Sequence, residues 1–287
     1  MKIAYCGYDF FSQCLQSLLS RGDGVYRVFT FDCDNRFDFN EYIATICEQH
    51  SLPFTSKPLD QNTLSELQQE NCELIITAGY RYKLPDLSNT GIRGINIHPS
   101  LLPVGRGPWP LSWTIQTDQK FSGITIHKLT DELDAGDILL QESFPLEINE
   151  NLESLSARTQ ILAKAMLPRV MENFNHYWNT ALPQPEESVY WPRPGNNDRT
   201  LNWNSNISEI DRLSRAYGKM GCFATFDNNY WVVYRLITWK ETHDFDTGSV
   251  VHKTNTEMIV AASDGLVSLQ YFEPASTIQP GLDEQVN

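Results

Sequence analysis

Residues 2–7 read Lys-Ile-Ala-Tyr-Cys-Gly, a short apolar run that ends in glycine and is typical of a buried strand. Residues 10–20 follow with apolar side chains at helical spacing, and residues 25–31, Val-Tyr-Arg-Val-Phe-Thr-Phe, predict a second strand. The alternation continues, with helices expected over 39–49 and 62–70 and strands over 74–79 and 94–98. This order predicts a parallel sheet covered by helices on both faces, with ligands beyond the carboxyl ends of its strands.

The composition favours a folded globular protein over a disordered one, because 41% of the 287 residues are hydrophobic and 20% are charged. A formal net charge of −14 should repel polyanions and anionic membrane surfaces at long range. No apolar run approaches the roughly 18–20 residues that span a bilayer, and the short, soon polar start of the sequence is not expected to be a signal peptide. Six cysteines without Cys-x-x-Cys spacing predict reduced thiols, a cytoplasmic location and no metal site.

The later part of the chain changes character. Residues 152–178 have a helical pattern that Pro168 is expected to kink or restart, and a proline-rich stretch over 183–195 is typical of a domain boundary. One further helix is expected over 207–217. Five short strands should follow, over 223–226, 230–238, 248–251, 258–262 and 266–272, with turn signals at 227–229 and 264–265.

We therefore expect an α/β fold in two domains. A Rossmann-like parallel sheet domain should cover residues 1–182, a linker residues 183–199, and a small β-rich, OB-like C-terminal domain residues 200–287. The chain has no Gly-x-Gly-x-x-Gly and no Walker loop, so the sheet is not expected to bind a dinucleotide or a nucleoside triphosphate.

The stretch most informative about chemistry is Asn-Ile-His-Pro-Ser-Leu-Leu-Pro at residues 96–103. Side chains alternate along a strand, so Asn96 and His98 should point to the same face at a strand's carboxyl end. A carboxamide beside an imidazole offers one hydrogen-bond donor and one proton carrier. An acyl transfer needs both, one to stabilise the oxyanion and one to move the proton of an amine.

A second stretch, residues 123–138, predicts a strand over 123–129 that runs into an acidic loop containing Asp134. This carboxylate follows Asn96 by 38 residues, so only the fold can bring the two together. His127 lies in the middle of the predicted strand and is expected to be a packed or exposed histidine rather than a functional one.

These two motifs, with Arg106-Gly107 between them, resemble the folate-dependent formyltransferase family, and most of all its sugar-nucleotide N-formyltransferases. The resemblance is close over residues 1–180 and looser beyond. It implies that Asn96, His98 and Asp134 are the catalytic residues. It also implies 10-formyltetrahydrofolate as co-substrate, bound by residues that precede the first motif or lie within the two motifs: Tyr80, Arg81, Tyr82, Leu84, Leu102, Asp131, Leu133 and Asp137.

The resemblance implies transfer of the formyl group to a primary amine. Asn96 and a protonated or proton-sharing His98 would stabilise the oxyanion, and Asp134 would orient His98 or a nearby water. We expect the acceptor to be an amino deoxy sugar linked to UDP, dTDP or GDP, for a bacterial surface glycan such as lipopolysaccharide. Its expected contacts are at a helix entry and in the loop between the motifs: Tyr8, Asp9, Phe10, Arg106 and Gly107.

Three alternatives stay open. Methionyl-tRNA is a second acceptor, but residues 190–287 hold eight Lys and Arg against twelve Asp and Glu, which disfavours a nucleic-acid partner. A free or carrier-bound amino acid is a third acceptor. A non-catalytic binder of folate or of a nucleotide sugar is the rival from another class. A homodimer is left open, and no membrane partner is expected.

Overall fold

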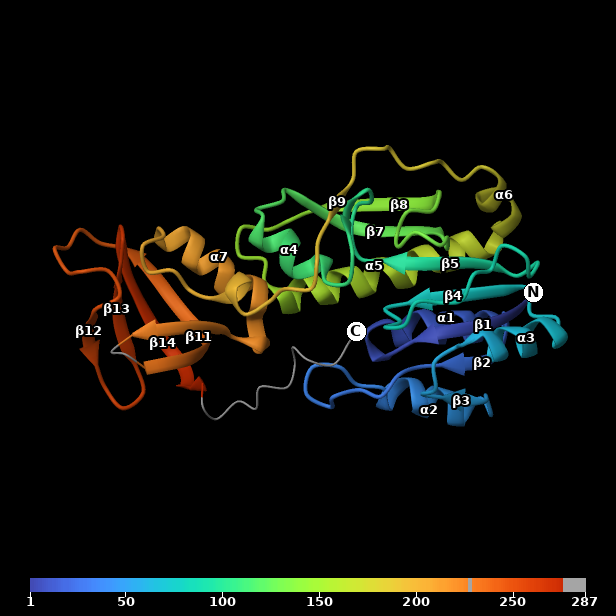
Figure 1. Ribbon diagram of the computed structural model, residues 1–287, viewed down its shortest axis with the longest axis horizontal. Helices are drawn as coiled ribbons and strands as arrows, with labels where there is room; N and C mark the ends of the chain where they lie inside the picture. Colours follow the sequence, from blue (N-terminus) through green and yellow to red (C-terminus); the bar gives the residue numbers. More distant parts are fainter. Residues whose placement is uncertain (227–228, 276–287) are drawn as a thin grey trace. The chain divides into compact units, whose positions relative to one another are not determined.

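The computed structural model describes residues 1–226 and 229–275, which fold into two compact units (Figure 1). The first unit comprises residues 1–110, 121–145 and 156–191, and the second comprises residues 111–120, 146–155 and those from 192 onward. The segment 183–191, which the sequence assigned to a linker, thus lies in the first unit. Residues 227 and 228 of one predicted turn lie outside the described residues.

The first unit is built on a seven-stranded sheet in the order β3-β2-β1-β4-β5-β7-β8. The strands in chain order are β1 (Lys2–Gly7), β2 (Gly24–Phe29), β3 (Phe54–Thr55), β4 (Leu74–Ala78), β5 (Arg93–His98), β7 (Phe121–Lys128) and β8 (Ile138–Pro145). β1 to β5 pair in parallel, as expected, but β7 runs antiparallel to both β5 and β8. The expected parallel sheet is therefore confirmed for β1 to β5, and the structure departs from it only at the edge, where β7 and β8 form an antiparallel hairpin.

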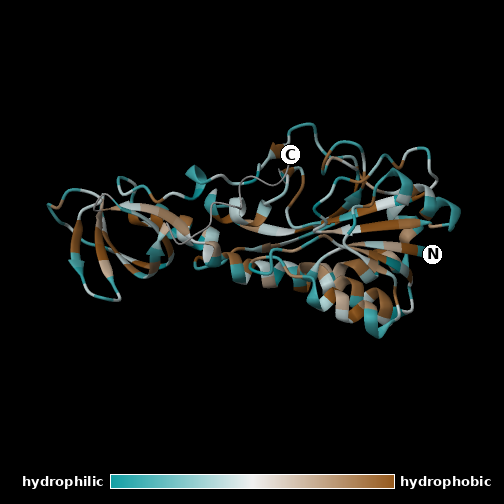
Figure 2. Cartoon of the chain, turned by 60° about the horizontal axis from the view of Figure 1, so that its bottom comes forward, coloured by the Kyte–Doolittle hydropathy of each residue, from teal (hydrophilic) through white to brown (hydrophobic). Residues whose placement is uncertain are grey.

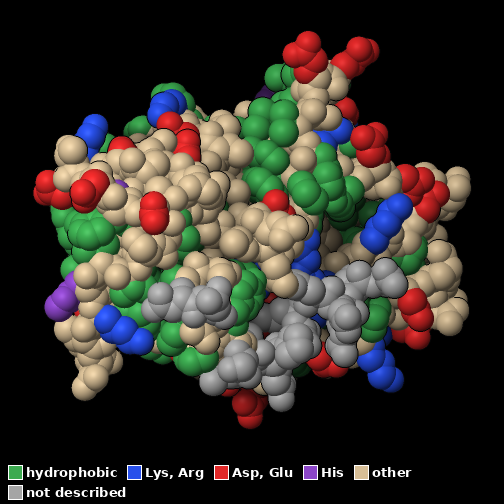
Figure 3. All heavy atoms as spheres, turned by 60° about the vertical axis from the view of Figure 1, so that its left-hand side comes forward, with side chains coloured by type: hydrophobic (Ala, Val, Ile, Leu, Met, Phe, Trp, Pro, Cys, Tyr) green, Lys and Arg blue, Asp and Glu red, His purple; other side chains and the backbone are tan. Residues whose placement is uncertain are grey.

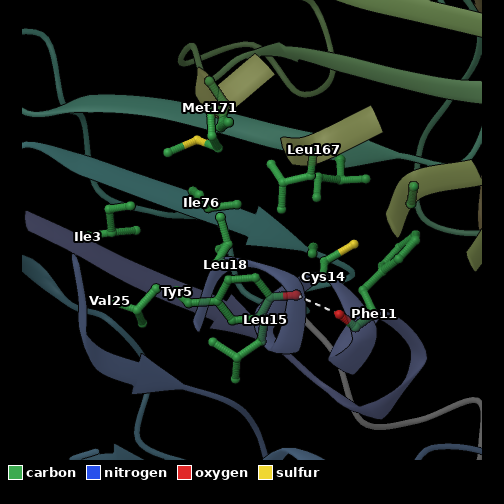
Figure 4. Packing of buried hydrophobic residues seen from close by; sticks show 14 of the residues in the cluster. Ile3, Tyr5, Phe11, Cys14, Leu15, Leu18, Val25, Ile76, Leu167 and Met171 are labelled. Carbon is green, nitrogen blue, oxygen red and sulfur yellow. Dashed lines mark hydrogen bonds between the residues drawn. The ribbon is translucent and has the colours of Figure 1, made fainter. Parts of the chain in front are cut away.

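Helices cover both faces of this sheet, as the sequence predicts. They are α1 (Ser12–Arg21), α2 (Glu41–Gln49), α3 (Gln61–Gln69), α5 (Leu152–Glu172) and α6 (Phe174–Asn179). Side chains of α1, α2 and α5 pack on one face, where Ile3 and Tyr5 of β1 point, and α3 packs on the other, where Ala4 and Cys6 point. Figure 4 shows the first of these clusters, with the Tyr5 hydroxyl donating to the carbonyl of Phe11 at 2.9 Å. Figure 2 shows the central strands as largely hydrophobic, as strands buried on both faces should be.

Local signals explain where several helices begin and end. Asp60 caps α3 by accepting the N–H of Thr63 at 2.8 Å, and Gly22 ends α1 in the left-handed conformation. Of the kink or restart expected at Pro168, the restart is wrong, because α5 continues through it to Glu172. Proline removes one hydrogen bond to a carbonyl one turn earlier, but Leu167 and Val170 beside it are fully buried and keep the helix in place.

The second unit holds the predicted β-rich domain. Helix α7 (Ile207–Tyr217) packs on an antiparallel sheet in the order β10-β11-β14-β13-β12. Its strands are β10 (Cys222–Phe226), β11 (Asn229–Lys240), β12 (Val250–Lys253), β13 (Met258–Ala262) and β14 (Gly265–Pro274). The expected five strands and helix are confirmed. The short helix α4 (Pro110–Gln116), which the sequence analysis missed, belongs mostly to this unit.

Three further findings bear on function. All six cysteines are unpaired, and five of them are buried. No helix in the described part of the chain is both long and apolar enough to cross a membrane. Within residues 1–226 and 229–275, no group of three or more His, Cys, Asp or Glu side chains is placed to hold a metal ion.

Candidate functional site

Asn96, His98 and Asp134 converge at the carboxyl end of β5. Asn96 Nδ2 donates to Asp134 Oδ1 at 3.2 Å, and His98 Nδ1 lies 3.6 Å from the same oxygen. β7 runs antiparallel to β5, so Lys128 at its end lies opposite Ile95 and the N–H of Leu129 donates to the carbonyl of Gly94. The acidic loop therefore starts beside the first half of β5 and turns back to bring Asp134 to Asn96 and His98. The juxtaposition that the sequence could only predict is therefore present.

The ring of His98 lies between β6 (Val104–Arg106) and the acidic loop. Its Nε2 donates to the carbonyl of Gly105 at 2.7 Å, in β6. In the neutral tautomer that makes this bond, Nδ1 carries the lone pair and faces Asp134. Burial is the strongest influence on His98 and lowers the pKa of its imidazole below 6.5, although Asp134 and the Gly105 carbonyl act in the opposite direction. His98 is therefore neutral at neutral pH, with a free proton acceptor at the site.

Asp134 occupies a left-handed backbone conformation, with φ 53°, at the turn of its loop. Burial alone would raise the pKa of its carboxyl, but His98, His127 and the N–H of Gly107 together hold that pKa well below its usual range. The Gly107 amide donates to Asp134 Oδ2 at 2.9 Å. Asp134 thus stays ionised beside a neutral imidazole, and it stabilises that imidazole once the ring gains a proton.

Asn96 is held by two residues that sequence reasoning did not assign to the site. The hydroxyl of Thr77, at the end of β4, donates to Asn96 Oδ1 at 2.8 Å. His127 Nε2 lies 3.1 Å from Asn96 Nδ2 and 3.5 Å from Asp134 Oδ1, while its Nδ1 lies 2.8 Å from the carbonyl of Lys128. His127 is the β7 partner of Asn96, so the antiparallel register of the two strands, had it been known, is the signal that could have found it.

Gly107 and Arg106, the predicted substrate residues in the loop between the motifs, make hydrogen bonds to other residues of the chain. A Cβ on Gly107, whose φ is +116°, would collide with the carbonyl oxygen of Trp191, so only glycine fits where the amide reaches Asp134. The guanidinium of Arg106 is 12% exposed. It donates from Nε and Nη2 to Gln184 Oε1, at 3.1 and 2.8 Å, and pairs through Nη1 with Glu132 at 3.1 Å.

The other expected substrate contacts lie where β1 ends. Tyr8 and Phe10 stack with ring centroids 6.1 Å apart, and Tyr8 also meets Phe31 at 5.2 Å. Both carboxylate oxygens of Asp9 accept backbone N–H groups of α2, from Tyr42 at 3.0 Å and Ile43 at 2.9 Å. Asp9 therefore caps this helix, and its part in substrate binding stays a prediction.

The expected folate contacts fall into two groups, beside β4 and in the acidic loop. Tyr80 and Tyr82 meet edge to face at 5.5 Å, and Arg81 lies 4.6 Å over the ring of Phe31. Leu84 packs with the core under α3, and Leu102 is buried.

In the acidic loop, Leu133 is 52% exposed next to Asp134, whereas Asp137 pairs with Lys128 at 2.9 Å. Asp131 is exposed in the same loop. An exposed leucine and two tyrosines are the kind of walls that a flat heterocycle needs, and their assignment to folate stays a prediction.

Two hollows of about 350 Å³ lie elsewhere in the described part of the chain. One is in the second unit between Gln116, Asn202 and Arg212, and one is at the amino end of β5 beside Arg93 and Gln68. Both have mainly polar linings and hold none of the predicted site residues. Within the first unit, the chemistry-bearing residues gather at the end of β5 opposite to the hollow beside Arg93.

The chain matches two known family models. One, described as Formyl transferase, covers residues 35–171, and the other, described as Formyl transferase, C-terminal domain, covers residues 195–279. Among curated relatives, methionyl-tRNA formyltransferase of Thermodesulfovibrio yellowstonii is 26% identical over 93% of this chain and 88% of its own length. That of Treponema denticola is 35% identical over 69% of this chain and 63% of its own length.

Solved structures with a similar fold include HypX of Aquifex aeolicus in complex with tetrahydrofolic acid, with a TM-score of 0.70 at 18% identity. That match covers 96% of this chain but only 44% of HypX. A second is WlaRD, a sugar 3N-formyl transferase solved with dTDP and 5-N-formyl-THF, with a TM-score of 0.70 at 17% identity over 94% of this chain and 97% of that one. A third is an N-formyltransferase of Helicobacter canadensis with folinic acid and dTDP-3-aminofucose, with a TM-score of 0.68 at 15% identity over 94% and 99%.

Proposed function

The chain belongs to the formyl transferase family, and from this premise we propose that it transfers the formyl group of 10-formyltetrahydrofolate to the primary amine of a nucleotide-linked amino sugar. The observation that carries the catalytic part is the convergence of a neutral imidazole, an ionised carboxylate and a carboxamide at the end of β5. The negative net charge of the chain is the observation that favours a small acceptor.

In the proposed reaction the folate, when bound, supplies an activated formyl group. The amine arrives neutral and gives one proton to Nδ1 of His98, and the imidazolium so formed is stabilised by Asp134 Oδ1 at 3.6 Å. The bond from the formyl carbon to the amine forms, and its bond to the folate nitrogen breaks. That nitrogen takes up a proton, and we propose the protonated His98 as its donor.

Asn96 is the donor for the formyl oxygen. Its two Nδ2 contacts, 3.2 Å to Asp134 and 3.1 Å to His127, are at the long end for hydrogen bonds, so sharing one N–H with a second acceptor has a modest cost. Thr77 holds the amide oxygen and thereby aims Nδ2. Removing a donor of this kind costs about 100–1,000-fold in rate in other acyl-transfer enzymes.

An acidic chain favours a small acceptor over a tRNA. Phosphate neutralisation by Lys and Arg supplies most of the affinity of proteins for nucleic acids, whereas this chain has a net charge of −14 and an excess of acidic residues after residue 190. Basic side chains lie scattered among acidic ones on the face drawn in Figure 3. A sugar linked to a nucleoside diphosphate needs only a local contact. WlaRD, solved with dTDP, and the Helicobacter canadensis N-formyltransferase, solved with dTDP-3-aminofucose, share this fold over nearly their whole length.

Methionyl-tRNA is the second candidate acceptor, and one observation favours it. Two of the curated relatives matched over more than nine-tenths of this chain, those of Thermodesulfovibrio yellowstonii and Lactobacillus gasseri, are methionyl-tRNA formyltransferases.

A panel of acceptors decides between the candidates. The purified chain is incubated with 10-formyltetrahydrofolate and with UDP-, dTDP- or GDP-linked amino sugars, or with methionyl-tRNA, and products are detected by mass. We expect a mass gain of one formyl group on one nucleotide sugar and none on the tRNA. Formylation of methionyl-tRNA alone would overturn the sugar assignment, and binding of a nucleotide sugar without turnover would favour a non-catalytic binder.

A further inference from the structure

The amide of Gln184 makes every hydrogen bond of which it is capable. Nε2 donates both protons, to the backbone carbonyls of Asp134 and Gly136, each at 2.8 Å. Oε1 accepts twice from Arg106, from Nε at 3.1 Å and from Nη2 at 2.8 Å. One side chain thus joins the turn that carries the catalytic carboxylate to the strand that carries the His98 acceptor, Gly105.

The backbone on both sides of Gln184 is fastened to the same unit. Leu182 exchanges two backbone hydrogen bonds with Ile138 at the start of β8, at 2.7 and 2.9 Å. Downstream, β9 (Val189–Tyr190) pairs in parallel with β6, and the N–H of Trp191 donates to the carbonyl of Arg106 at 2.7 Å. Gln184 is therefore held between two fixed points, and its side chain is not free to leave the loop.

The turn at Asp134 needs such support. Asp134 has φ 53°, in a region that non-glycine residues rarely adopt, and a Cβ on Gly136 would collide with the carbonyl oxygen of Lys128. Glu132 in the same loop is 75% exposed, so its pair with Arg106 adds little. The two bonds from Gln184, about half-buried and with ideal lengths, are the stronger constraint.

We propose that Gln184 is a positioning residue of the formyltransferase. Its four hydrogen bonds, which we call the clamp, hold the Asp134 turn to Arg106 and so keep the Asp134 carboxylate beside His98 Nδ1. The role in turnover rests on the proposed function. Gln184 touches none of the reacting groups and acts through Asp134. Arg106, expected as a substrate contact, is part of the clamp. Its guanidinium binds Oε1 of Gln184 through two N–H groups and so orients the Gln184 amide with both Nε2 protons toward the acidic loop.

Two substitutions separate the clamp from simple packing. Gln184→Leu keeps the volume and removes all four hydrogen bonds, and it should lower kcat by about 10–100-fold with little change in KM. The ratio of its kcat to that of the unchanged protein should not depend on pH. Gln184→Glu keeps the acceptor for Arg106 but faces two carbonyl oxygens with a carboxylate. The two carbonyls raise the pKa of that carboxyl and Arg106 lowers it. The kcat ratio of this variant should be lowest where the carboxyl is ionised and should recover as the pH falls through that pKa, because the protonated carboxyl donates one bond again.

Gln116→Leu is the matched control. Gln116 also uses both ends of its amide, donating to the Asp198 carbonyl at 3.1 Å and accepting from Tyr217 at 2.8 Å, but in the second unit. This variant should lose stability without losing kcat. A Gln184→Leu protein with kcat within twofold of the unchanged protein, or a Gln184→Glu protein whose ratio stays flat with pH, would overturn the proposal. If Gln184→Leu does not fold, the pH dependence of the kcat ratio of Gln184→Glu tests the proposal by itself.

A measurement without turnover keeps the two proposals apart. The pKa of the Asp134 carboxyl, followed by carbon NMR and assigned with Asp134→Asn, should rise in Gln184→Leu, because the carboxylate drifts from His98 and from the Gly107 amide. If that pKa rises while no acceptor is formylated, the proposed function fails and the clamp stands. If formylation proceeds and neither kcat nor the pKa changes, the clamp fails alone.

Discussion

Replacing Asp134 with asparagine should separate the charge of this residue from its shape. Asparagine also tolerates the left-handed backbone at φ 53° and can still accept the N–H of Gly107, so the turn should survive. What is lost is a negative charge 3.6 Å from His98 Nδ1. With an effective dielectric constant of about 20, a pair at that distance interacts by about 5 kcal/mol, which is an upper limit of roughly three units in the pKa of His98.

The loss should appear in both the titration and the rate. The pKa of His98, already lowered by burial, should fall further in Asp134→Asn, and kcat should drop by about 100–1,000-fold because the imidazolium loses its counter-charge. Nitrogen NMR of the ring gives the first quantity, and formylation of the acceptor found in the panel gives the second.

Asp118→Asn is the control for this experiment. Asp118 has the same φ of 53° but an exposed carboxylate that pairs with Lys120 at 2.9 Å, so its substitution should leave kcat unchanged. The reasoning is refuted if Asp134→Asn keeps the rate of Asp118→Asn, or if the pKa of His98 rises when the carboxylate is removed.

Three further outcomes follow from the same contacts. Gly107→Ala should destabilise the fold by more than about 2 kcal/mol in urea unfolding, because its Cβ meets a backbone carbonyl, whereas Gly91→Ala, at φ +74° with open space, should cost only about 1–2 kcal/mol; equal losses would contradict this. Thr77→Val should lower kcat about tenfold at nearly unchanged KM, since Asn96 Oδ1 loses its donor, and an unchanged kcat would remove Thr77 from the site. Because the folded pKa of His98 lies below its unfolded value, the unfolded chain binds more protons below pH 6.5. Stability should therefore fall as the pH drops from 7.5 to 5.5, by more in the unchanged protein than in His98→Gln, and parallel curves would show that this ring is not the cause.

Much of the first unit was predictable because its signals are local. Apolar runs ending in glycine mark β1 and β4, and Asp60 caps its own helix three residues on. The direction of β7 relative to β5 was not predictable, since the connection over residues 99–120 is long enough for a parallel crossover as well as for an antiparallel return. Pro168 shows the opposite case, in which a strong local signal was outweighed by burial of the residues around it.

The site divides in the same way. The order of Asn96, His98 and Asp134 along the chain, and the motifs around them, are properties of the sequence alone, and so is the acidic charge that favours a small acceptor. Only the folded chain decides that His98 is neutral, because its pKa depends on burial and on a carboxylate 36 residues away. Gln184 has no signal in its own neighbourhood. The proposed positioning role of Gln184 depends on the path of the chain, which returns past β8 and β6. Side-chain hydrogen bonds between segments 50 residues apart form only where the tertiary structure brings those segments together.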